Sequence, residues 1–136
     1  VAGNITEQLS VVGGYTYSDG KFLDSISGTV TAGNILPNMP KHSASLWTRF
    51  DPIEQLGIAA GVIHQGRRFS ATDNAVSMPS YTRVDGAIYY DINEKVGLQL
   101  NVENIFNERY FLYAHSNTNH TPGAPRIFKL GLNAKF

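Results

Sequence analysis

Between residues 98 and 107 the chain reads Leu98-Gln99-Leu100-Asn101-Val102-Glu103-Asn104-Ile105-Phe106-Asn107. Apolar side chains at positions 98, 100 and 102 alternate with polar side chains at positions 99, 101 and 103. A period of two places successive side chains on opposite faces of an extended chain. The stretch therefore predicts a β-strand over residues 98–103 with one apolar and one polar face.

The same alternation recurs in other segments of nearly constant length, at residues 9–18, 42–50, 56–65, 81–92 and 128–136. A strand of about ten residues is long enough to cross a bilayer at a tilt of about 45°. The connections alternate in size: short at residues 51–55 and around 93–95, long at 19–41, 70–80 and 114–125. Successive hairpins would place every long loop at one end of the sheet, which is typical of outer-membrane β-barrels.

The number of predicted strands points to a larger assembly. About eight strands are the smallest useful number for a membrane barrel, so these segments must pair with a partner or form part of a larger barrel. The chain opens at Val1 in what reads as the tail of a preceding strand, which favours the larger barrel. A weak repeat with spacings of 47 and 40 residues overlaps the period of propeller blades, which have four strands each. Only two predicted strands fall in each period of this chain, which disfavours a propeller.

In a membrane barrel the apolar row faces lipid and the polar row lines the lumen. The predicted lumen-facing residues are Arg49, Arg83, Asp85, Gln99, Asn101 and Glu103. A water-facing sheet packed on a protein core would show the same alternation. Loop asymmetry and strand length, and not the alternation itself, favour the membrane.

Composition excludes several classes of protein. The chain has 136 residues, 11 basic and 11 acidic side chains, and no Lys/Arg-rich block, which argues against nucleic-acid binding. It has no cysteine, and therefore no disulfide or thiolate site. No run approaches the 18 or so apolar residues of a membrane-spanning helix, and residues 1–4 show no signal-peptide pattern.

The sequence lacks the common catalytic motifs. The chain has no Gly-x-Ser-x-Gly, His-Glu-x-x-His or phosphate-binding glycine loop, so we expect no enzyme activity. His115 and His120 lie in one long loop without a third strong ligand nearby, so we expect no metal site. Arg83 and Asp85 are interpreted as a lumenal ion pair.

Residues 101–110, Asn-Val-Glu-Asn-Ile-Phe-Asn-Glu-Arg-Tyr, resemble the penultimate-strand motif of TonB-dependent outer-membrane receptors, and Pro-Gly-Ala-Pro-Arg at 122–126 resembles the lead-in to their last strand. Residues 39–47 and 79–85 are similar to strand starts in the ferric-siderophore branch, which includes the ferrichrome and pyoverdine receptors. The C-terminus resembles the signal read by the outer-membrane assembly machinery, with Phe128, Leu130, Leu132 and Phe136; Ala134 is smaller than the residue often found there.

The resemblance implies an all-β, antiparallel up-and-down transmembrane β-barrel in the bacterial outer membrane. Residues 1–136 would form the last six of its twenty-two strands, without the N-terminal plug, the energy-coupling box and the earlier strands. It implies TonB-dependent uptake of a ferric siderophore, in which the TonB complex acts through the absent plug. Iron arrives already chelated, so no cofactor is expected.

The same resemblance places ligand contacts in the long loops. The candidates are Tyr113, His115, Asn117, His120 and Phe69. Loop composition does not distinguish hydroxamate from catecholate siderophores, and related receptors import cobalamin or sugars. The alternative is a small structural or adhesive outer-membrane barrel protein completed by self-association.

Overall fold

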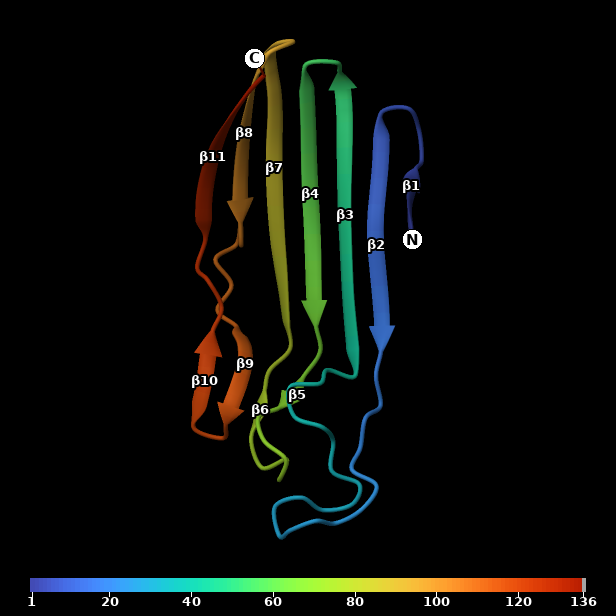
Figure 1. Ribbon diagram of the computed structural model, residues 1–136, viewed down its shortest axis with the longest axis vertical. Helices are drawn as coiled ribbons and strands as arrows, with labels where there is room; N and C mark the ends of the chain where they lie inside the picture. The colour runs from blue at the N-terminus through green and yellow to red at the C-terminus, as the bar shows by residue number, and fades with distance from the viewer. Residues whose placement is uncertain (136) are drawn as a thin grey trace.

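The computed structural model describes residues 1–135, and its regular structure is β-strand. The long strands of the main sheet are β2 (Leu9–Tyr17), β3 (His42–Ile53), β4 (Leu56–Gln65), β7 (Tyr81–Asn93), β8 (Val96–Glu103) and β11 (Ile127–Ala134) (Figure 1). A short strand, β1 (Ala2–Asn4), pairs with β2, and the seven-stranded sheet has the order β1-β2-β3-β4-β7-β8-β11. Every pair is antiparallel, which confirms the predicted all-β meander.

The strand register joins the apolar positions of neighbouring strands into one continuous face. One row across this apolar face consists of Phe50, Ile58, Ile88, Leu100 and Leu130, each paired with the next. Slipping any strand by one residue would turn its apolar side chains to the opposite face. The row therefore fixes which side of the sheet is apolar.

Within residues 1–135, no protein layer covers the apolar face. Ile58, on a central strand, is 46% exposed, and Leu130, on the edge strand, is 77% exposed. Among residues 1–135 the buried apolar side chains are few, namely Ala59, Met78, Ala87, Tyr110 and Ala114. An uncovered apolar face of this size is typical of a surface that contacts a membrane or another protein. The alternative, a sheet packed on its own core, is excluded for this part of the chain.

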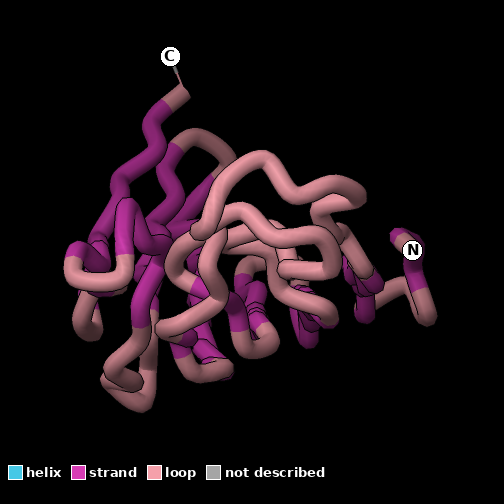
Figure 2. The backbone as a smooth tube through the Cα atoms, turned by 90° about the horizontal axis from the view of Figure 1, so that it is seen from below, coloured by secondary structure: helices cyan, strands magenta, loops and turns pink. Residues whose placement is uncertain are grey.

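The two ends of the sheet differ. Figure 1 shows the short turns at one end and the long connections at the other, and Figure 2 shows the long connections gathered over the concave side of a curved sheet. We call these the turn end and the loop end. No helix in the described residues is long and apolar enough to cross a membrane.

Three predicted connections differ from the structure. β3 continues through Ile53 with an irregularity after Phe50, so the predicted turn at residues 51–55 shrinks to residues 54–55. The predicted loop at 114–125 contains most of a hairpin formed by β9 (Phe111–Ser116) and β10 (Asn119–Pro122). The loop at 70–80 is bounded by β5 (Arg68–Phe69) and contains β6 (Ser77–Met78), its partner. These segments are rich in turn-forming residues, so the sequence predicted connections where the structure has short strands.

Candidate functional site at the loop end and polar face

The polar face of the main sheet lies opposite the apolar face. The structure places the six predicted lumen-facing residues on it: Arg49, Arg83, Asp85, Gln99, Asn101 and Glu103. Trp47 lies on the same face and packs over Gly61, where an added Cβ would lie 2.1 Å from the indole. The position opposite this tryptophan therefore requires glycine.

Charges on the polar face are paired with one another. Arg49 Nε donates to Asp51 Oδ1 at 2.9 Å, Arg83 Nη2 donates to Asp85 Oδ2 at 2.7 Å, and Lys129 contacts Glu103. The guanidinium of Arg49 also lies 4.5 Å from the centre of the Tyr89 ring. Among the ion pairs of the described residues, the Arg83–Asp85 pair is the one largely shielded from solvent, whereas the exposed pairs contribute little to stability.

The Arg83–Asp85 pair extends into the connection between β8 and β9. Asp85 Oδ1 accepts a hydrogen bond from the backbone N–H of Asn104 at 2.8 Å, and Arg83 Nη1 donates to the Tyr110 hydroxyl at 3.1 Å. Tyr110 stacks on Tyr81 with ring centres 4.3 Å apart. The polar face and the loop end thus form one continuous network.

Asn104 organises this connection. It is 1% exposed and has a φ of 54°, a left-handed conformation that asparagine tolerates better than most residues. Its Nδ2 donates to the carbonyl oxygens of Glu108 and Ala124, both at 3.0 Å, and its Oδ1 accepts from the Glu108 N–H at 2.8 Å. The first asparagine of the motif at residues 104–107 therefore satisfies backbone groups from both ends of the loop.

Arg68 ties β5 to the β9 strand. Its side chain is buried, with 4% of the residue exposed, and its two terminal nitrogens donate to the carbonyl oxygens of Phe111 and Leu112 at 2.7 Å. The guanidinium also lies 5.6 Å from the centre of the Tyr81 ring. Burial lowers the pKa of Arg68 from its usual value, although an arginine remains charged at neutral pH.

Two asparagines link the long connections through peptide groups. Asn38 Nδ2 donates to the Ala114 carbonyl at 2.8 Å, while its Oδ1 accepts from the Ala114 N–H at 2.7 Å. Asn74 makes the same two-way contact with the peptide groups of Ile35, at 2.7 and 2.8 Å. Each side-chain amide donates one hydrogen bond to a backbone carbonyl and accepts one from the N–H of the same residue, as a paired β-strand residue does. Together with Asn104 and Arg68, these contacts make residues 18–41, 66–80 and 104–126 one unit, the loop-end cluster.

The predicted ligand residues all belong to this cluster but differ in exposure. Tyr113 and His115 are exposed on β9, with their rings edge to face at 4.9 Å. Asn117 donates to Asp73 Oδ2 and His120 Nε2 lies 2.8 Å from Ser70 Oγ, so both side chains already bond to the neighbouring connection. Phe69 is half-buried, with the guanidinium of Arg67 5.4 Å from its ring centre.

The Ser70–His120 contact was not foreseen from the sequence. A serine and a histidine at this distance form the nucleophile and base of many hydrolases. Ser70 is only 2% exposed, however, and no group of three His, Cys, Asp or Glu side chains in the described part of the chain could hold a metal ion. The contact therefore serves to hold two connections together. The predicted lack of enzyme activity stays a prediction.

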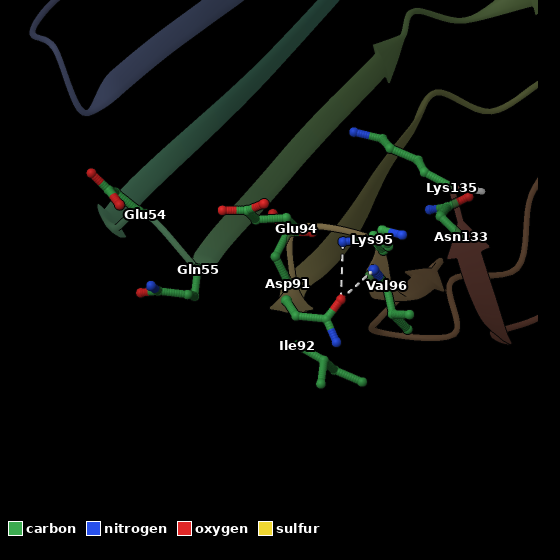
Figure 3. Close-up of a pocket in the computed structure, with 11 residues that line it drawn as sticks. Glu54, Gln55, Asp91, Ile92, Glu94, Lys95, Val96, Asn133 and Lys135 are labelled. Atoms are coloured by element: carbon green, nitrogen blue, oxygen red, sulfur yellow. Dashed lines mark hydrogen bonds between the residues drawn. The ribbon is translucent and has the colours of Figure 1, made fainter.

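Two further features lie away from the loop end. Phe128, Leu130 and Leu132, predicted as part of the assembly signal, extend from the apolar face of β11; Phe136 lies outside the described residues. At the turn end, a hollow of about 780 Å³ is lined by charged residues that include Glu54, Glu94 and Lys135 (Figure 3). Its turn is closed by Asn93, whose Oδ1 accepts from the N–H groups of Lys95 and Val96.

Comparison with known proteins settles the family. The family model described as "TonB dependent receptor-like, beta-barrel" matches residues 2–105 of the chain. The chain belongs to the TonB-dependent receptor family. Its relatives include the probable TonB-dependent siderophore receptor PiuA of Acinetobacter baumannii, 34% identical over 98% of this chain. The catecholate siderophore receptor Fiu of Escherichia coli is 31% identical over the whole chain.

The fold agrees with solved receptors of this family. The crystal structure of the siderophore receptor PiuA from Acinetobacter baumannii superposes with a TM-score of 0.90, at 33% identity, over 99% of this chain. The chain spans about a fifth of the length of these relatives, 19% of PiuA and 19% of Fiu. As a TonB-dependent receptor barrel sequence, it is an outer-membrane protein whose strands cross the bilayer.

Proposed function

We propose that the chain is the C-terminal barrel segment of an outer-membrane receptor that takes up a ferric siderophore. The observation that carries this proposal is the match of nearly the whole chain, at 34% and 31% identity, to relatives named as siderophore receptors. In this proposal the chain supplies the last six strands of a barrel of twenty-two. The plug, through which the TonB complex acts, lies elsewhere in the same receptor.

The loop-end cluster supports a division of labour among the predicted ligand residues. Tyr113 and His115 are exposed side by side on β9 and are free to contact a chelate. Asn117 and His120 are engaged with Asp73 and Ser70, so in this proposal they position the hairpin. Because a siderophore supplies the iron ligands itself, aromatic and polar contacts suffice.

Titration of the full-length receptor with a panel of ferric chelates tests the proposal. The panel comprises a ferric catecholate, a ferric hydroxamate and ferric citrate, and binding of at least one is expected. Tyr113→Ala should weaken that binding about tenfold, because it removes one aromatic contact with the bound chelate. Tyr90→Ala is the matched control, since Tyr90 is 48% exposed and Tyr113 43%, but Tyr90 lies near the turn end of β7.

The outcomes separate the parts of the proposal. A receptor that binds none of the chelates would contradict siderophore uptake. Binding that Tyr113→Ala and His115→Ala both leave unchanged would remove the β9 hairpin from the site. The comparisons do not favour the self-associating structural or adhesive barrel, which predicts a complex of several copies of this chain without a plug.

A further inference from the structure

The apolar face carries a groove of about 370 Å³ toward the loop end of β7 and β8. Gly86 forms the floor of the groove, because it has no side chain to fill the space between the surrounding apolar side chains. The walls are apolar: Ile58, Ile88, Leu100, Val102 and Phe128. Ile105 also lines the groove and lies next to the floor, since its Cδ1 would be 3.2 Å from a Cβ added to Gly86. The volume falls within the range of about 300–1,000 Å³ found for small-molecule pockets.

A cation lies at the loop end of this groove. Arg126 lines it and directly precedes β11, with its guanidinium 5.9 Å from the centre of the Phe128 ring. Arg126 Nη1 donates to the Ile105 carbonyl oxygen at 3.2 Å. Among residues 1–135 no carboxylate lies within ion-pair distance of this arginine. A guanidinium has five N–H donors, so most of them remain available to an anion.

The location determines what can occupy the groove. It lies on the apolar face, which contacts lipid in an outer-membrane barrel. Completing the barrel would not cover it: of the described strands that line the groove, β4, β7 and β8 have both neighbours, and β11 has one free edge. An arginine near the membrane interface costs about 0–1 kcal/mol, compared with about 2–4 kcal/mol at the midplane, so Arg126 is tolerated beyond the strand end.

We propose that the groove binds one anionic membrane lipid. An acyl chain lies over Gly86 between Ile58 and Phe128, and the headgroup phosphate accepts charge-assisted hydrogen bonds from Arg126. The occupant is a lipid and not a peptide, because the lining offers acyl-chain contacts and a single cation at one end. This inference rests on the membrane location of the barrel and is independent of the siderophore.

Native mass spectrometry of the full-length receptor tests this site. The receptor is released from nanodiscs of phosphatidylcholine doped with phosphatidylglycerol, and the retained phosphatidylglycerol is counted as collision energy rises. We expect Arg126→Gln to weaken retention of one lipid about tenfold, because a charge-assisted contact is lost. Gly86→Leu should abolish retention of the same lipid by filling the groove. Arg126→Lys keeps the positive charge, so this variant should retain most of the lipid that Arg126→Gln loses.

Lys41→Gln is the matched control. It removes one positive charge at the same end of the sheet, where the Lys41 ammonium lies 5.7 Å from the Tyr17 ring, away from the groove. Unchanged retention is expected. Equal losses for Lys41→Gln and Arg126→Gln, or full retention by a folded Gly86→Leu receptor, would show an ordinary lipid-facing surface and overturn the proposal. Siderophore binding should be unchanged in the Gly86→Leu receptor, because Gly86 lies on the apolar face of β7 and outside the loop-end cluster.

Discussion

The spanning sheet and the loop-end cluster are held together in different ways. The sheet depends on backbone pairing and leaves its apolar side chains uncovered, so that Ile58 is nearly half exposed. The cluster depends on single polar side chains that satisfy backbone groups, such as Asn104 and Arg68, and it buries them almost completely. A lipid-facing sheet can tolerate exchange among apolar residues, whereas the cluster depends on particular amides and one guanidinium.

The largest expected effect is that of Asn104→Ala. The substitution leaves two carbonyls and one N–H without partners and places alanine at a φ of 54°. We expect a loss of about 4 kcal/mol in folding free energy, since each unsatisfied buried group costs about 1–3 kcal/mol. The measurement is the unfolding transition of the full-length receptor in detergent.

Asn104→Gly is the control for this prediction. Glycine accepts the left-handed conformation but lacks the amide, so it should recover about 1 kcal/mol of the loss. If Asn104→Gly unfolds at the same point as the unmodified receptor, the amide contacts are unimportant and backbone conformation alone explains the residue.

A second prediction tests the assignment of the two faces. Leu100 lies on the apolar face in the middle of β8, and its neighbour Asn101 lies on the polar face. Leu100→Arg should cost about 3 kcal/mol, because arginine at the bilayer midplane costs about 2–4 kcal/mol. Asn101→Arg should cost less than about 1 kcal/mol if its face borders water.

Folding of both variants in vesicles of phosphatidylcholine, followed by urea titration, measures this difference. Equal destabilisation by the two substitutions would contradict the lipid assignment of the apolar face.

The sheet could be predicted from the sequence because one physical rule governs it. Alternation over residues 98–103 fixes both the strand and its two faces, and β4 was predicted with its observed bounds. The last residues of β3 were missed, because Asp51 and Pro52 are typical of turns but here lie in an irregular strand end.

The loop-end cluster could not be predicted in the same way. Its contacts join residues far apart in the chain, such as Asn38 and Ala114. The alternation of apolar and polar residues along one strand does not predict such a contact. The available signal was weak: asparagine tolerates a positive φ, and Asn38, Asn74 and Asn104 all have one. For Ser70 and His120 no sequence signal indicated that the two side chains would meet.

A smaller effect is expected for Asn38→Gly, which tests whether each asparagine of the cluster holds its own contact. Glycine keeps the φ of 59° but removes the amide that pairs with Ala114. Because the Ala114 N–H loses its acceptor, its hydrogen exchange in the full-length receptor should become about tenfold faster, which corresponds to about 1.4 kcal/mol. Asn34→Ala, which removes one hydrogen bond to the Thr72 carbonyl, should leave this amide unchanged. Faster exchange at Ala114 in both variants would mean that the cluster opens cooperatively, whereas a response to Asn38→Gly alone would mean that each asparagine holds its own contact.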